Sequence, residues 1–230
     1  MSGSAAFFDL DRTVVEGSTG PVFSDALREW GLLETRRHPL EALLFGTYEL
    51  IGETAVTVAL TRHAARLVEG WKVGLVREAG AAAATRLLGS VAPYLRAELV
   101  IQRRAGRAIV MATTSPDELA RPLAAALGFD DVIATCYGRG KGRFDGTIDG
   151  ELLWGDAKWQ AVKEWCRRND VDPTASAAYS DSYNDLPLLD GVGSPVAVNA
   201  DPRLALVASR RGWAVRSLHE PAAQPDSTGR

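Results

Sequence analysis

The sequence predicts an α/β fold, in which a mostly parallel sheet lies between helical layers and a small all-helical bundle is inserted. Three observations predict this class. After about residue 91, apolar strand-like runs alternate with helix-like periodicity, as in parallel sheets with crossover helices. One further apolar run, at residues 5–8, is followed by a stretch to about residue 89 with helical periodicity alone. A chain of 230 residues is long enough for one α/β domain with an insertion.

The insertion is predicted to hold four short helices. Apolar positions recur at helical spacing around residues 22–30, 40–51, 56–67 and 75–87, and Gly31 ends the first of these stripes. We therefore predict three parts. They are an α/β core of residues 1–16 and 90–218, a helical cap of residues 17–89 and a flexible tail of residues 219–230, where Pro, Ala, Ser and Gly are frequent.

The part of the chain after the insertion supplies the remaining strands and helices of the predicted sheet. Strands are predicted at residues 108–112, 132–135, 175–179, 195–198 and 213–215. Helices are predicted at residues 116–127, 156–168 and 202–211. The Gly-rich stretch of residues 137–150 predicts a hairpin with tight turns.

Composition excludes several classes of function. Apolar residues make up 46% and charged residues 24%, as in ordinary soluble enzymes. The net charge of −3, without a long basic run, argues against a nucleic-acid partner. Cys136 and Cys166 have no paired spacing, which argues against a disulfide framework or a zinc site. No segment approaches the roughly 18 consecutive apolar residues of a membrane span, so we expect no membrane association and a cytoplasmic location.

Two carboxylates stand two positions apart after the first predicted strand. Because side chains alternate along a strand, Asp9 and Asp11 can emerge on one side at its carboxyl end, where open α/β sheets bind ligands. Such a close pair repels unless a cation lies between, and a hard divalent cation such as Mg²⁺ suits carboxylate oxygens. The alternative is an Asp-rich turn in which Asp11 caps a helix.

Hydroxyl side chains follow the predicted strand at residues 108–112. Ser115 is a plausible helix N-cap, and Pro116 suits the first helical position. This assignment leaves Thr113 and Thr114 beside a helix N-terminus, which is a ready site for a phosphoryl group. Simple capping is the alternative.

A lysine and a second pair of carboxylates begin two later helices. Lys158 lies in the first turn after a predicted Asp156 N-cap, where a cation opposes the helix dipole unless anions lie nearby. An exposed lysine is the alternative. Asp181 and Asp185 are four apart after a strand, so they can face one point if a helix begins there. The alternative is a capped helix that starts at Asp181 or Ser182.

The order of these segments resembles the haloacid dehalogenase-like phosphohydrolases, from about residue 7 to residue 213. The helical insertion after the first motif and the run Tyr-Ser-Asp-Ser-Tyr-Asn-Asp-Leu-Pro-Leu-Leu look like the branch that contains phosphoserine phosphatase. The resemblance implies a Rossmann-like three-layer α/β/α core with a helical cap. It also implies Mg²⁺-dependent hydrolysis of a small phosphorylated metabolite through an aspartyl-phosphate intermediate.

The resemblance assigns catalytic roles to four of the singled-out residues. Asp9 would be the nucleophile, and Asp11 would be the general acid and then the base that activates water. Thr113 would bind a phosphoryl oxygen, with Thr114 as the alternative if the register shifts by one. Lys158 would neutralise charge on the phosphoryl group and hold Asp9 in place.

The resemblance also implies a magnesium site. Asp9, the backbone carbonyl of Asp11 and Asp181 would bind Mg²⁺ directly, while Asp185 would act directly or through water. Asn184 matches a position that orients the nucleophilic water or a phosphate oxygen in this branch.

The expected substrate site departs from the family pattern at one position. Phosphoserine phosphatases carry a Glu there that binds the substrate's amino group, whereas this chain has Ser18, with Glu16 two residues earlier as a substitute. A small phosphomonoester is therefore the leading prediction and phosphoserine itself an alternative. Two other classes are weighed: a receiver domain, which the length and the insertion disfavour, and a catalytically idle binding or regulatory relative.

Overall fold

A computed structural model describes residues 3–34 and 65–219. The predicted helix at residues 40–51, the predicted helix at 56–67 up to residue 64, and the tail from residue 220 lie outside the described residues. The strands are β1 (Ala5–Phe8), β2 (Ala108–Pro116), β3 (Asp131–Gly140), β4 (Arg143–Asp149), β5 (Ala177–Ser180), β6 (Ser194–Val198) and β7 (Ala214–Arg216). The main helices are α1 (Gly20–Glu29), α4 (Val73–Leu87), α5 (Leu95–Arg104), α6 (Asp117–Leu127), α7 (Asp156–Arg168), α8 (Leu186–Gly191) and α9 (Pro202–Arg211).

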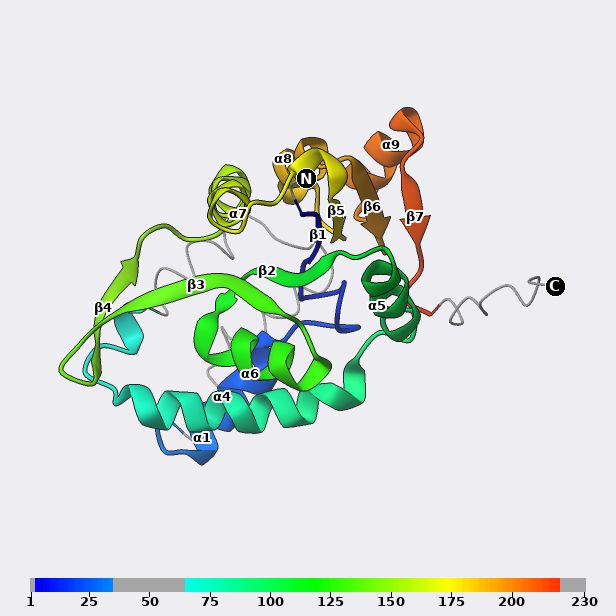
Figure 1. The fold of residues 1–230 in the computed structure, drawn as a ribbon. Coiled ribbons are helices and arrows are strands. Elements are labelled where there is room, and N and C mark those ends of the chain that lie inside the picture. Colours follow the sequence, from blue (N-terminus) through cyan, green and yellow to red (C-terminus); the bar gives the residue numbers. More distant parts are fainter. Residues whose placement is uncertain (1–2, 35–64, 220–230) are drawn as a thin grey trace.

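The strands form one seven-stranded sheet in the order β4-β3-β2-β1-β5-β6-β7, which is parallel except for the β3–β4 hairpin (Figure 1). Its register decides what lies beside the end of β1. Phe8 is paired with Met111 of β2 and with Tyr179 of β5. The residues after β1, β2 and β5 therefore meet at one edge of the sheet, where ligands of open α/β sheets bind.

Helices cover both faces of the sheet, which confirms the predicted three-layer α/β/α core. Alternate residues of β1 face opposite sides: Ala6 and Phe8 belong to one buried cluster, and Ala5 and Phe7 to the other. The first cluster includes residues of α5 and α6, and the second includes residues of α7, α8 and α9. Figure 1 shows these two groups of helices on opposite sides of the strands.

Three contacts hold the segment between β1 and α5 in place. Where it leaves and returns, Val15 forms an antiparallel bridge with Val91. Along its length, α4 runs beside α6 (Figure 1), and a Cβ built on Gly80 would come within 1.9 Å of the Glu118 backbone oxygen. Only a glycine allows this approach of the two helix backbones. The division into a core and a cap of residues 17–89 stays a prediction.

The β3–β4 hairpin makes the third connection. Its two turn residues, Lys141 and Gly142, have φ values of 51° and 76°, as the predicted tight turn requires. The hairpin is tied to the start of α4 because the Gly70 amide donates to the Phe144 carbonyl at 2.9 Å and the Val73 amide donates to Gly142 at 3.0 Å. Hydrogen bonds between backbone groups thus link the inserted segment to the sheet.

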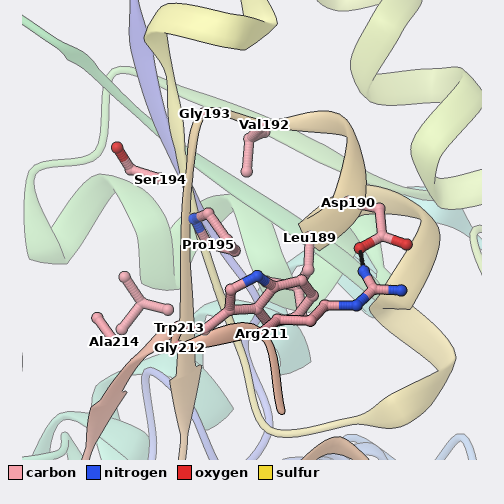
Figure 2. A pocket seen from close by; sticks show the side chains of 11 residues that line it. Leu189, Asp190, Val192, Gly193, Ser194, Pro195, Arg211, Gly212, Trp213 and Ala214 are labelled. Carbon is pink, nitrogen blue, oxygen red and sulfur yellow. Dashed lines mark hydrogen bonds and ion pairs between the residues drawn. The ribbon is translucent and has the colours of Figure 1, made fainter. Parts of the chain in front are cut away.

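A surface hollow lies at the other edge of the sheet. It is lined by residues at the amino ends of β6 and β7, among them Pro195 and Trp213, and by the Asp190–Arg211 ion pair (Figure 2). Since the predicted site residues follow the carboxyl ends of β1, β2 and β5, this hollow is separate from them. No helix within residues 3–34 and 65–219 has the length and apolar character of a bilayer span.

Candidate active site

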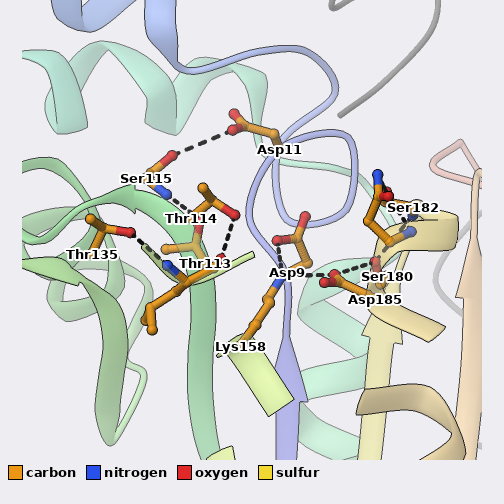
Figure 3. A network of polar contacts seen from close by, with 12 residues as sticks. Asp9, Asp11, Thr113, Thr114, Ser115, Thr135, Lys158, Ser180, Ser182 and Asp185 are labelled. Carbon is orange, nitrogen blue, oxygen red and sulfur yellow. Dashed lines mark hydrogen bonds and ion pairs between the residues drawn. The ribbon is translucent and has the colours of Figure 1, made fainter. Parts of the chain in front are cut away.

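A buried lysine joins two of the predicted carboxylates. Lys158, in the first turn of α7, has no exposed side-chain surface. Its Nζ donates to Asp9 Oδ1 and to Asp185 Oδ2, both at 2.7 Å (Figure 3). The exposed-lysine alternative is therefore wrong. A charged amine buried without these partners would carry a large desolvation penalty, so the three groups form one electrostatic unit.

Asp9 lies in a strongly perturbed environment. Burial raises its pKa to about 7, while the ammonium group of Lys158 opposes the rise and the carboxylate of Asp185 adds to it. One lysine thus only partly offsets two buried carboxylates. The charged form of Asp9 is therefore not fully compensated at the carboxyl end of β1.

Asp185 is held from the opposite side by the loop after β5. The Ser180 hydroxyl donates to Asp185 Oδ2 at 2.6 Å, and the Ser182 amide donates to Ser180 Oγ at 3.1 Å. Ser182 in turn accepts from the Asn184 amide and caps the short turn Tyr183–Asp185, which resembles the alternative of a capped helix that starts at Asp181 or Ser182. The other carboxylate oxygen of Asp185, Oδ1, is buried with no hydrogen-bond partner. A buried anionic oxygen of this kind is where a cation or donor belongs.

Asp11 is positioned by Thr19, which was not among the predicted site residues, and by Ser115, which was predicted to be an N-cap. The Thr19 amide donates to Asp11 Oδ1 at 2.6 Å. The Ser115 hydroxyl lies 3.4 Å from Asp11 Oδ2 (Figure 3). The prediction that Ser115 is an N-cap is wrong. Because β2 continues to Pro116, which pairs with Thr135 of β3, helix α6 begins only at Asp117.

The two adjacent threonines have different partners. Thr114 donates its hydroxyl to the Leu153 carbonyl at 2.7 Å, and the Leu153 amide donates to Thr135 Oγ1 at 3.3 Å. These bonds hold the segment that leads into α7 and so help to place Lys158. Thr113 is buried, and its hydroxyl oxygen accepts from the Ser115 amide at 3.1 Å. A hydroxyl that accepts in this way still has a proton to donate.

The N-cap of helix α7 differs from the prediction. Its N-cap position is occupied by Gly155 at a φ of 57°, whereas Asp156 is the first helical residue and is exposed. Asp156 is therefore not an N-cap. A glycine suits this position because L-residues rarely adopt such a backbone conformation.

Asp181 forms an ion pair with an arginine. Arg12 Nε lies 3.2 Å from Asp181 Oδ2, and the Arg12 backbone has a φ of 57°. Within the described residues, no three His, Cys, Asp or Glu side chains are grouped closely enough to hold a metal ion. Sequence reasoning overlooked Arg12, although it stands inside the first motif, because motif spacing does not tell which way a variable residue points.

The residues nevertheless fit a magnesium ion in two respects. The donors are carboxylate and carbonyl oxygens, the ligands that Mg²⁺ prefers. Asp185 Oδ1 is a buried, unpartnered acceptor, and Lys158 does not fully compensate the charged form of Asp9. Asp9, Asp181 and Asp185, with the Asp11 backbone carbonyl, are therefore the groups that could bind the ion.

Three further residues belong to the predicted substrate site or its alternatives, and each is half-buried or exposed. Ser18 is half-buried and accepts from the Gly20 amide at 3.4 Å, next to the Thr19 amide that holds Asp11. Glu16, its expected substitute, is exposed and lies 3.5 Å from His219. Asn184 is half-buried and donates its side-chain amide to Ser182 Oγ at 3.2 Å.

Comparison with known proteins identifies the family and the fold. The model of the haloacid dehalogenase-like hydrolase family matches residues 6–190. Phosphoserine phosphatase SerB1 of Mycobacterium tuberculosis is 34% identical over 219 residues, which cover 94% of this chain and 71% of that protein. A protein of unknown function from Bordetella pertussis Tohama I has a TM-score of 0.79 at 26% identity and covers 95% of this chain and 100% of its own. A phosphoserine phosphatase, solved as an analogue of the phospho-aspartyl intermediate, shares the fold at a TM-score of 0.66 and 18% identity, with 96% of both chains covered.

Proposed function

Because the chain belongs to the haloacid dehalogenase-like hydrolase family, we propose that this phosphatase hydrolyses a small phosphate monoester, with Asp9 as the nucleophile. The observation that carries the proposal is the buried Asp9–Lys158–Asp185 unit at the carboxyl end of β1. A lysine buried between two carboxylates is an arrangement that folding alone does not favour over an apolar core. It does suit a site that must hold an anionic substrate.

The covalent step is assigned to Asp9 and the proton transfers to Asp11. A carboxylate oxygen of Asp9 attacks phosphorus, the bond from phosphorus to the ester oxygen breaks, and an aspartyl-phosphate forms. Asp11 gives its proton to the leaving oxygen and then, as a carboxylate, takes a proton from the water that attacks phosphorus. The bond from the Asp9 oxygen to phosphorus breaks in this second step, which frees Asp9 and releases inorganic phosphate. The bonds from the Thr19 amide and the Ser115 hydroxyl hold Asp11 for this role.

Positive and hydrogen-bonding groups stabilise the phosphoryl oxygens. Lys158 supplies a fixed cation, and Thr113 is the better candidate for a phosphate-binding hydroxyl, because Thr114 already donates to Leu153. Groups that are already oriented before the substrate binds stabilise developing charge without rearranging.

Mg²⁺ is the proposed cofactor. When bound, it would neutralise negative charge on the phosphoryl group and the carboxylates. Asp9, Asp181, Asp185 and the Asp11 backbone carbonyl would hold it. Asn184 would orient the attacking water or a phosphate oxygen.

The substrate is proposed as a small phosphorylated metabolite, of which phosphoserine is one possibility. A relative with 34% identity is named a phosphoserine phosphatase, which favours that ester. Ser18 stands where phosphoserine phosphatases use a Glu to bind the amino group, which argues against it. Glu16 Oε1, on the possible substitute, lies 3.5 Å from His219 Nδ1. The proposed substrate class is therefore a small phosphate monoester.

A panel of esters tests the activity. Purified protein is incubated with phosphoserine, small sugar phosphates and p-nitrophenyl phosphate, with Mg²⁺ and with a chelator, and released phosphate is measured. We expect phosphate from at least one ester and only with the metal, since the carboxylates repel a dianionic ester without it. Release from none of them would contradict the proposal.

Arg12 provides a separate test of the metal site. Its guanidinium competes with a cation for Asp181, so Arg12→Ala is expected to tighten Mg²⁺ binding by about fivefold, the equivalent of about 1 kcal/mol for a partly exposed ion pair. Calorimetric titration of metal-free protein measures this affinity, with Arg167→Ala, an exposed arginine on α7, as control. Unchanged or weaker binding in Arg12→Ala would contradict the assignment of Asp181 as a ligand.

A further inference from the structure

One aspartate outside the predicted motifs contacts two different elements at once. Asp201 lies in the turn between β6 and α9, and its Oδ1 accepts from the amides of Arg203 and Leu204 at 2.8 and 2.9 Å. These are the bonds of an ordinary helix N-cap. Its second oxygen, Oδ2, accepts from the Tyr183 amide at 2.6 Å, in the neighbouring loop.

That neighbouring loop, residues 181–185, carries both carboxylates that follow β5. The Asp201 backbone contacts it as well, because the Asp201 amide donates to the Asp181 carbonyl at 2.8 Å. One bond therefore fixes the loop at Asp181, and the other fixes it at Tyr183, midway to Asp185. The Tyr183 ring is covered in addition by the Arg203 guanidinium, whose central carbon lies 3.9 Å from the ring centroid.

Helix capping does not account for this arrangement. A serine or an asparagine supplies the single acceptor oxygen that a helix N-terminus needs. A carboxylate has a second oxygen, and here that oxygen makes the shortest of the three side-chain bonds of Asp201. A bond to an ionised acceptor is also roughly twice as strong as one between neutral groups.

We propose that Asp201 is a positioning residue for magnesium binding: its second carboxylate oxygen holds the 181–185 loop in the conformation that presents Asp181 and Asp185 to the ion. This inference rests on the proposed function for the identity of the ligands. Because Mg²⁺ demands near-ideal geometry from few protein oxygens, a loop that is free to move would bind it less tightly.

Two variants of Asp201 separate the loop contact from the helix cap and from simple charge attraction. Asp201→Asn keeps the shape and one acceptor oxygen for α9, but presents an NH₂ group to the Tyr183 amide. Asp201→Glu keeps the negative charge but moves the carboxylate by one methylene. Asp172→Asn is the matched control, because Asp172 caps a turn before β5, at the other edge of the sheet.

The experiment titrates metal-free protein with Mg²⁺ in a calorimeter and follows amide hydrogen exchange. We expect the Kd for Mg²⁺ to rise at least tenfold in both Asp201 variants and to stay within twofold of wild type in Asp172→Asn. In metal-free Asp201→Asn, the Tyr183 amide should exchange at least tenfold faster while the amides of α9 keep their protection.

Three results would overturn the inference. Wild-type affinity in both Asp201 variants would show that the loop needs no support from Asp201. Weaker binding in Asp201→Asn alone would indicate charge attraction, and weaker binding in Asp201→Glu alone would indicate the helix cap. The readout is metal affinity, so it stays separate from the proposed function: protein that binds Mg²⁺ in this way but releases no phosphate in the ester panel would contradict the phosphatase proposal and leave the role of Asp201 intact.

Discussion

Replacing Asp9 with Asn is expected to reduce the rate of phosphate release by about 10⁴-fold or more, because an amide oxygen cannot form the covalent intermediate. The protein should fold normally. Burial already raises the pKa of Asp9 to about 7, which means that its charged form is not favoured by the folded environment. Lys158 would keep Asp185 as an anionic partner. Phosphate release from the best ester of the panel, together with a thermal melt, measures both effects.

Asp149→Asn is the control for this substitution. It makes the same chemical change at an exposed carboxylate at the end of β4. We expect wild-type activity and stability from it. Full activity in Asp9→Asn would rule out Asp9 as the nucleophile, and an equal loss in Asp149→Asn would point to a general effect of lost charge.

The second large effect is expected from Lys158→Met, which keeps most of the side-chain volume and removes the charge. Two carboxylates, each 2.7 Å from the ammonium group, would be left buried without a cationic partner. Breaking a buried ion pair in this way costs about 3–5 kcal/mol of unfolding free energy. We also expect phosphate release to fall by about 10²–10³-fold or more, as when one preorganised charge-stabilising group is removed. Urea unfolding and phosphate release report the two losses.

Lys163→Met is the matched control on the same helix. Lys163 is exposed and lies over the Trp159 ring, 5.5 Å from its centroid. A surface substitution of this kind changes the unfolding free energy by about 0.5 kcal/mol or less. Wild-type stability in Lys158→Met would contradict the electrostatic unit that the site depends on.

Local sequence predicted some elements to the residue and missed the ends of others. Helices α7 and α9 begin and end as predicted, since their apolar periodicity, the proline at the start of α9 and the turn residues act within a few positions. Strand β2 runs beyond its predicted end at residue 112, to Pro116, because pairing with Thr135 of β3 extends it. That pairing is a long-range contact, and no local pattern reports it.

The candidate site divides in the same way. The motifs predicted which residue types follow β1, β2 and β5, and the structure brings Asp9, Lys158 and Asp185 together. The motifs did not reveal Asp201, because a helix N-cap has the same local sequence whether or not its second oxygen contacts another loop. They also did not reveal that Arg12 pairs with Asp181.

By itself, the sequence determined the fold class, the family resemblance and the set of acidic, hydroxyl and ammonium groups at the strand ends, because periodicity and motif spacing are local properties of a chain. Only the tertiary structure decided that Lys158 is buried and that Asp201 holds the 181–185 loop. It also decided that the Thr114 hydroxyl donates to the segment before α7, whereas the Thr113 hydroxyl accepts from the Ser115 amide. The physical reason is distance along the chain. Lys158 and Asp9 are separated by 149 positions, so their contact exists only once the sheet has set the register of β1 against its neighbours.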